Sequence, residues 1–204
     1  AIGIFKDQAA VDAYPHWAGA RPGDIIFKDV NGDNVIDGND RVRNDKSRTP
    51  RFTGGLNVDL GYKDFDLSFL LQGAMGGVFY QTTESGDFAN FLKSFYDNRW
   101  TEENPDADFP RTYNRSNEYF INQQNTFWLH KTDYIRLKNI ELGYTVPSIW
   151  SKKIGVEHLR VYINAYNLLT ISPDMKDYDP ENTSGSGYNY PLNKVINFGV
   201  NLTF

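Results

Sequence analysis

The stretch Val195-Ile196-Asn197-Phe198-Gly199-Val200-Asn201-Leu202-Thr203-Phe204 decides the fold class. Its apolar residues alternate with small or polar ones, without a break, up to Phe204. Period two is typical of a β-strand, because successive side chains point to opposite faces of a sheet. The ends of soluble proteins usually fray and are polar. The pattern therefore favours a membrane strand that ends at an interfacial aromatic residue over a strand docked in a sandwich core.

Four earlier stretches share the period-two pattern: 52–62, 65–72, 134–146 and 159–166. The first two flank Lys63-Asp64, which predicts a β-hairpin with a two-residue turn. The third stops at Pro147, and a short link leads from there to the fourth. Within the third stretch the apolar residues change phase near Lys138-Asn139, which predicts a β-bulge.

The links between these five strands alternate in length. The first and third are short, whereas the second and fourth contain the long polar segments 73–125 and 172–191. Outer-membrane β-barrels combine short periplasmic turns with long extracellular loops. We therefore expect residues 1–51 and both long segments to be extracellular, and Phe204 to lie on the periplasmic side as a barrel terminal signal.

Five strands cannot close a barrel, and unpaired backbone groups in lipid cost several kcal/mol each. The sequence therefore predicts that the remaining strands lie on another piece of the same protein. That piece should pair with Phe52–Tyr62 at one edge and with Val195–Phe204 at the other.

The alternation also predicts which side chains face lipid and which face the lumen. The lipid-facing set contains Leu56, Leu67, Leu142, Val161 and Phe198. The lumen-facing set contains Asn57, Asp66, Glu141, Tyr162 and Asn197.

The composition excludes several classes of protein. The 204-residue chain has a formal net charge of -5, so it lacks the basic surface that a nucleic-acid partner requires. It contains no Cys, which excludes disulfides and Cys-based metal sites. No apolar run approaches the ~18 residues that indicate a transmembrane helix.

A series of short motifs runs in order from Pro22 to Phe204. They are Pro22-Gly23-Asp24-Ile25, Asp29–Asp33, Tyr62–Ser68, Gln72-Gly73, Arg99-Trp100-Thr101, Asn104-Pro105, Pro110-Arg111, Asp133–Tyr144, Asn164–Leu169, Tyr190-Pro191 and Phe198–Phe204. The ordered series resembles SusC/RagA-type TonB-dependent outer-membrane transporters, and it corresponds to the C-terminal part of their barrel.

The resemblance implies an all-β fold: about five C-terminal strands of a transmembrane, antiparallel barrel of roughly 22 strands, with long extracellular loops. It implies import of oligosaccharides or peptides across the outer membrane of a Gram-negative cell. It also implies a SusD-like surface lipoprotein and a TonB contact through the missing N-terminal part, which carries the plug. The chain then divides into an extracellular region, 1–51, and the barrel strands and loops, 52–204.

Residues 29–40 form an Asp-rich loop with the spacing of an EF-hand. Its oxygen donors fall at loop positions 1, 3, 5, 7, 9 and 12, which are the positions that supply the Ca²⁺ ligands in an EF-hand. The predicted ligands are Asp29, Asn31, Asp33, the Val35 carbonyl, Asp37 and Asp40. Two residues depart from the pattern, because position 6 is Asn34 and position 12 is Asp rather than Glu. The alternative is a solvated turn rich in Asp and Asn.

The segment 73–125 is rich in aromatic residues, and a short helix is expected over Phe88–Trp100. Tyr96 and Trp100 are the candidates for contact with a substrate or with the SusD-like lipoprotein that would act as a lid. The alternative is that these aromatic side chains pack the loop onto itself.

Two other functions compete with the transporter. One is a secreted, calcium-dependent β-sandwich that binds glycans, which would need no detergent. The other is an enzyme, which we do not expect, because the acidic pairs Glu102-Glu103 and Asp106/Asp108 lie in a polar loop without a catalytic partner. Three histidines lack metal-ligand spacing: His16, His130 and His158.

Overall fold

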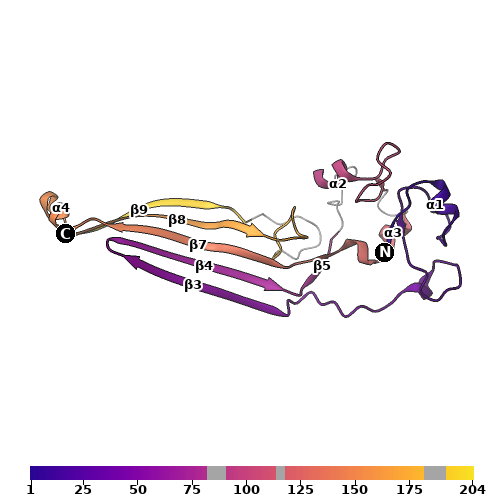
Figure 1. Ribbon diagram of the computed structural model, residues 1–204, viewed down its shortest axis with the longest axis horizontal. Helices are drawn as coiled ribbons and strands as arrows, with labels where there is room; N and C mark the ends of the chain where they lie inside the picture. Colours follow the sequence, from indigo (N-terminus) through magenta and orange to yellow (C-terminus); the bar gives the residue numbers. More distant parts are fainter. Residues whose placement is uncertain (82–90, 114–117, 182–191) are drawn as a thin grey trace. The chain divides into compact units, whose positions relative to one another are not determined.

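The computed structural model describes residues 1–81, 91–113, 118–181 and 192–204 (Figure 1). The described residues form two compact units. Unit 1 combines those within 1–46 and 79–130, and unit 2 combines those within 47–78, 131–181 and 192–204.

Unit 2 is one antiparallel sheet whose five strands follow one another as in the chain. The strands are β3 (Phe52–Tyr62), β4 (Phe65–Met75), β7 (Tyr134–Thr145), β8 (His158–Ile171) and β9 (Val195–Thr203). All five predicted strands are confirmed, and β4 and β8 extend beyond the predicted ends. The long links, 76–133 and 172–194, leave the same end of the sheet, as expected from the alternation of link lengths.

The tight turn and the bulge are both where the sequence predicts them. The turn between β3 and β4 contains Lys63, whose φ of 53° gives it the left-handed conformation of a tight hairpin. Along β7, Leu137 pairs with Leu71 and Asn139 pairs with Leu70, so Lys138 is the inserted residue. This insertion restores the phase of the apolar face across the whole strand.

The sheet has one apolar face and one polar face. The strand registers place five predicted lipid-facing residues on the same face: Leu56, Leu67, Leu142, Val161 and Phe198. The set containing Asn57, Asp66, Glu141, Tyr162 and Asn197 occupies the other. The apolar side chains are largely exposed, and 81% of the Phe198 surface is accessible.

A β-sandwich would cover that apolar face with a second sheet. Among the described residues the other two sheets have only two strands each: β1 (Gly3–Ile4) with β2 (Ile25–Ile26), and β5 (Val78–Tyr80) with β6 (Leu129–Lys131). The sandwich alternative is therefore not supported by the architecture.

The remaining elements are short helices. They are α1 (Gln8–Asp12), η1 (Gly38–Asp40), α2 (Lys93–Asn98), α3 (Tyr119–Asn122), η2 (Thr126–Trp128), α4 (Ser148–Ser151) and η3 (Lys152–Ile154). In the part of the chain that the structure describes, none of them has the length and apolarity to cross a membrane. A shorter helix, α2, lies within the expected range Phe88–Trp100, and the start of that range lies outside the described residues.

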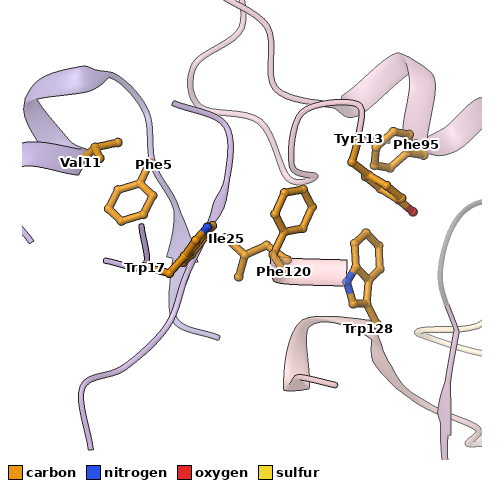
Figure 2. Close-up of a cluster of buried hydrophobic side chains, with 8 residues drawn as sticks. All are labelled: Phe5, Val11, Trp17, Ile25, Phe95, Tyr113, Phe120 and Trp128. Atoms are coloured by element: carbon orange, nitrogen blue, oxygen red, sulfur yellow. The ribbon is translucent and has the colours of Figure 1, made fainter. Parts of the chain in front are cut away.

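Unit 1 is built around an aromatic core that the sequence pattern did not predict (Figure 2). Two segments far apart in the chain contribute to it. The core side chains are Phe5, Val11, Trp17, Ile25, Phe95, Tyr113, Phe120 and Trp128. Tyr113 meets Phe120 edge-on, with ring centroids 5.6 Å apart and planes at 86°, an arrangement that aromatic pairs favour. Much of segment 73–125 is therefore a packed body and not an extended loop.

Replacing a core aromatic should unfold unit 1 selectively. Phe120 is completely buried, so Phe120→Ala is expected to destabilise the unit by about 3–5 kcal/mol through lost burial and a cavity. Tyr96→Ala, at an exposed position 24 residues earlier, is the matched control and should cost less than about 1 kcal/mol. Hydrogen exchange of unit 1 amides measures both changes, and equal protection in the two variants would contradict the assigned core.

Candidate functional site

The polar face of the sheet carries two networks of charged side chains. The first is centred on Arg160 in β8. Its Nε donates to Oδ1 of Asp66 in β4 at 3.0 Å, and its Nη2 donates to Oε1 of Glu141 in β7 at 2.7 Å. Beyond Glu141 the network continues through Asn164 to Asn197 in β9, whose Nδ2 donates to Oδ1 of Asn164 at 2.9 Å. One chain of polar contacts thus crosses four strands.

Gly143 makes the centre of this network possible. A Cβ atom at this position would lie 2.3 Å from the guanidinium of Arg160 and 2.5 Å from Oδ1 of Asp66. Real Cβ atoms do not approach other atoms so closely, so only Gly leaves room for the pair between β4 and β8. The motif containing Gly143 was identified in the sequence, but its role as a space for an ion pair was not.

The second network holds a segment of the long link after β8 against the sheet. Arg136 in β7 is only 1% exposed, and its Nη2 donates to both carboxylate oxygens of Asp179 at 2.7 and 2.8 Å. Its Nη1 pairs with Glu181, which also accepts from the Tyr134 hydroxyl at 2.7 Å. The Nε of Arg136 donates to Thr170 at 3.0 Å. Since a buried guanidinium is costly unless its donors are used, these partners fix the segment's position.

Unit 1 has its own buried ion pair. The Nε of Arg111 lies 2.7 Å from Oδ1 of Asp24, which is 1% exposed. Burial raises the pKa of Asp24, and the charge of Arg111 opposes that shift. Arg111 also binds Glu118 at 2.7 Å. Burial acts to raise the pKa of Glu118, but the hydrogen bonds and charges of Arg111 and Arg21 outweigh it and lower this pKa. These contacts join the N-terminal segment to α3.

Two grooves on unit 1 share Tyr119 in their lining. Both are also lined by Asp37 and Arg41 from the Asp-rich region and by Asn122 from α3. The ring of Tyr119 stacks on Trp17, with centroids 5.1 Å apart. The grooves thus combine aromatic and polar lining residues, which sequence reasoning missed because Asp37 and Arg41 lie about 80 positions from Tyr119.

The Asp-rich loop folds as a series of turns around its first residue. Asp29 accepts hydrogen bonds from the backbone N–H of Gly32 at 2.6 Å and of Asn34 at 2.9 Å. Asn34 has a φ of 63°, the left-handed conformation expected at position 6. At the end of the loop Asp40 accepts from the N–H groups of Val30 and Asp37, and these bonds lower its pKa.

The predicted ligands offer oxygen donors, but they are not gathered around one centre. In the described residues no group of three or more His, Asp or Glu side chains is arranged so that it could hold a metal ion. A carboxylate has about four lone-pair sites, so the hydrogen bonds to the backbone are compatible with cation binding. The donor chemistry thus fits Ca²⁺, and binding would require these side chains to rearrange around one centre.

Tyr96 and Trp100 have different surroundings. Tyr96 is exposed, and the guanidinium of Arg99 lies over its ring, 4.0 Å from the centroid. The Nε1 of Trp100 donates to the Lys6 carbonyl at 3.0 Å. A Cβ atom on Gly23 would lie 2.6 Å from the indole, so Trp100 packs directly on this glycine. Packing within unit 1 thus accounts for Trp100, while Tyr96 remains available for contact.

The comparisons with known proteins agree with this architecture. No family model matches the chain. TonB-dependent receptor P3 of Formosa agariphila is 32% identical over 199 residues, which cover 90% of this chain and 19% of the receptor. Receptor P26 of the same organism is 31% identical over 225 residues, covering 100% of this chain and 22% of the receptor. The TonB-dependent receptor SusC of Bacteroides thetaiotaomicron is 29% identical, over 90% of this chain and 18% of the receptor.

The fold gives the same relationship. A solved structure of the RagAB peptide importer in its closed-closed state matches with a TM-score of 0.62 and 29% identity. The match covers 84% of this chain and 19% of the importer chain. The chain thus spans about a fifth of the length of the proteins that it matches. Its homologues are therefore TonB-dependent receptors, SusC among them, and its fold is similar to part of the RagA barrel.

Proposed function

We propose that this chain forms part of the wall of an outer-membrane transporter. The observation that carries the proposal is the two-faced sheet, whose exposed apolar face suits lipid and whose charged face suits a water-filled lumen. Within the described residues, β3 and β9 each pair on one side only. In a membrane such edges need partner strands, which supports a closed barrel completed by other strands of a longer protein.

The whole transporter would import oligosaccharides or peptides. The name of the matched RagAB complex, a peptide importer, supports the second of these substrates. A SusD-like lipoprotein would cover the extracellular side, and a segment elsewhere in the protein would contact TonB. With the long links on the extracellular side, unit 1 lies outside the cell with its grooves and the exposed Tyr96. Phe204 then lies at the periplasmic rim.

The Arg136 network gives the polar face a second role. It holds residues 172–181 against the lumen side of the sheet, so we propose that this segment lines the passage at its extracellular end. The segment would then limit the size of what enters the barrel.

The Asp-rich loop would bind one structural Ca²⁺ through Asp29, Asn31, Asp33, the Val35 carbonyl, Asp37 and Asp40. The oxygen donor set and the turn at Asn34 support this assignment. The ion would fix the loop beside the groove that Asp37 and Asp40 help to line.

A charge placed on the apolar face should disrupt membrane folding. Ile140→Arg lies near the middle of β7 on the apolar face, and Arg near the bilayer midplane costs about 2–4 kcal/mol in a barrel. Asn57→Arg, on the polar face, is the control and should have little effect. Urea titrations of the protein folded into vesicles measure both, and equal destabilisation would argue against a lipid-facing surface.

Removal of Arg136 should release the segment that it holds. Arg136→Met leaves Asp179 and Glu181 without their cation, and breaking a buried pair costs about 3–5 kcal/mol, less where the partner is as exposed as Glu181. Tryptic cleavage after Lys176 should become at least about tenfold faster. Arg160→Met removes a guanidinium from the same face without touching the segment, and the same acceleration in this control would contradict the assignment.

Calorimetric titration tests the calcium site directly. We expect one Ca²⁺ per chain, no comparable heat with Mg²⁺, and at least about tenfold weaker binding for Asp33→Asn, which removes one charged ligand. Asp108→Asn, which lies outside the loop, is the control. The absence of binding at millimolar Ca²⁺ in the unaltered protein would disprove the site.

A further inference from the structure

The short link between β7 and β8 exposes its largest apolar side chains. It contains α4 and η3, and Ile149, Trp150 and Ile154 are 70%, 60% and 68% exposed. Its buried residues are Ser151, at 1%, and Val156, at 5%. A link surrounded by water would be expected to bury its large apolar side chains as well.

This exposure belongs to a firmly held structure. The amide of Trp150 donates to the Pro147 carbonyl at 2.8 Å, and the amide of Val156 donates to Ser151 at 3.1 Å. Val156 is buried, and the Glu157 amide donates to Thr203 of β9 at 2.8 Å. The link is therefore fixed to the sheet in a conformation that keeps the apolar side chains outside.

The link lies at the end of the sheet where exposed aromatic side chains gather. The β3–β4 turn and the end of β9 are at this same end (Figure 1). Tyr62 and Phe65 flank the turn, Phe204 follows β9, and all three are exposed. Aromatic side chains in such a band are characteristic of the level where a barrel meets lipid headgroups.

The charges of the link indicate the chemistry of its partner. Residues 147–155 include Lys152 and Lys153 but no acidic residue. Neither lysine forms an ion pair with another residue in the described parts of the chain. Apolar and aromatic side chains beside unpaired lysines are the combination that binds the interface of an anionic bilayer.

We propose that residues 147–155 are a membrane-interface foot, which inserts Ile149, Trp150 and Ile154 among lipid headgroups and binds anionic phosphate with Lys152 and Lys153. The proposal rests on the proposed function, since the apolar sheet face must lie in the same bilayer. It goes further in assigning the link to lipid rather than to water or to a protein partner.

Quenching by brominated lipids tests the foot in the complete transporter, reconstituted in phosphatidylcholine vesicles. The other three Trp residues, Trp17, Trp100 and Trp128, belong to unit 1, so the difference between the unaltered protein and Trp150→Phe isolates Trp150. Bromines near the headgroup should quench this component more strongly than bromines deep in the acyl chains. Phe198→Trp, made in the Trp150→Phe background, reports the sheet face independently and should be quenched by the deep bromines.

The two reporters separate the possible failures. If the Phe198→Trp signal is quenched and the Trp150 component is not, the foot is disproved and the barrel wall stands. If neither is quenched, the proposed membrane location of the sheet fails as well.

The lysines are tested with brominated phosphatidylglycerol. At equal mole fraction it should quench Trp150 several-fold more strongly than brominated phosphatidylcholine, because each lysine at an anionic surface favours the anionic lipid by a factor of about five. The preference should disappear in Lys152→Gln/Lys153→Gln and persist in the control Lys46→Gln/Lys131→Gln. Equal quenching by the two lipids in the unaltered protein would overturn the phosphate-binding part of the proposal.

Discussion

The backbone hydrogen-bond ladder that joins β3, β4, β7, β8 and β9 is the interaction on which the rest of unit 2 depends. The ladder satisfies the backbone groups of the three inner strands and fixes their register, so every second side chain falls on the same face. A slip by one residue would exchange the lipid-facing and lumen-facing sets. The inserted Lys138 shows how closely the register is kept, because it corrects the phase of β7 partway along its length.

Register also decides where charge can be placed. Asp66, Glu141 and Arg160 come from three neighbouring strands and meet only because their positions are in phase, with Gly143 leaving the necessary space. Arg136 uses the same face to hold residues 172–181. The polar face thus combines a cross-strand ion network with a loop anchor. The side chains of the opposite face are apolar and need no hydrogen-bond partners.

The sheet could be predicted from the sequence because its pattern is local. The alternation over 195–204, the turn at Lys63-Asp64 and the phase change near Lys138 each lie within a few residues, and the structure confirms all three. The core of unit 1 could not be predicted, because Trp17 and Phe120 pack with their ring centroids 6.4 Å apart without any periodicity in the segments that carry them. The packing of Trp100 on Gly23 could not be predicted for the same reason, since the two residues lie far apart in the sequence.

The two-faced sheet is tested most directly by the accessibility of β9 in a bilayer. This chain contains no Cys, so single cysteines at positions 195–203 can carry spin labels without background from its own residues. Collision with oxygen, which concentrates in lipid, should peak at positions 196, 198, 200 and 202. Collision with a water-soluble nickel complex should peak at the positions between them. The predicted result is this alternation with period two, and equal access of the nickel complex to both sets would contradict a strand between lipid and lumen.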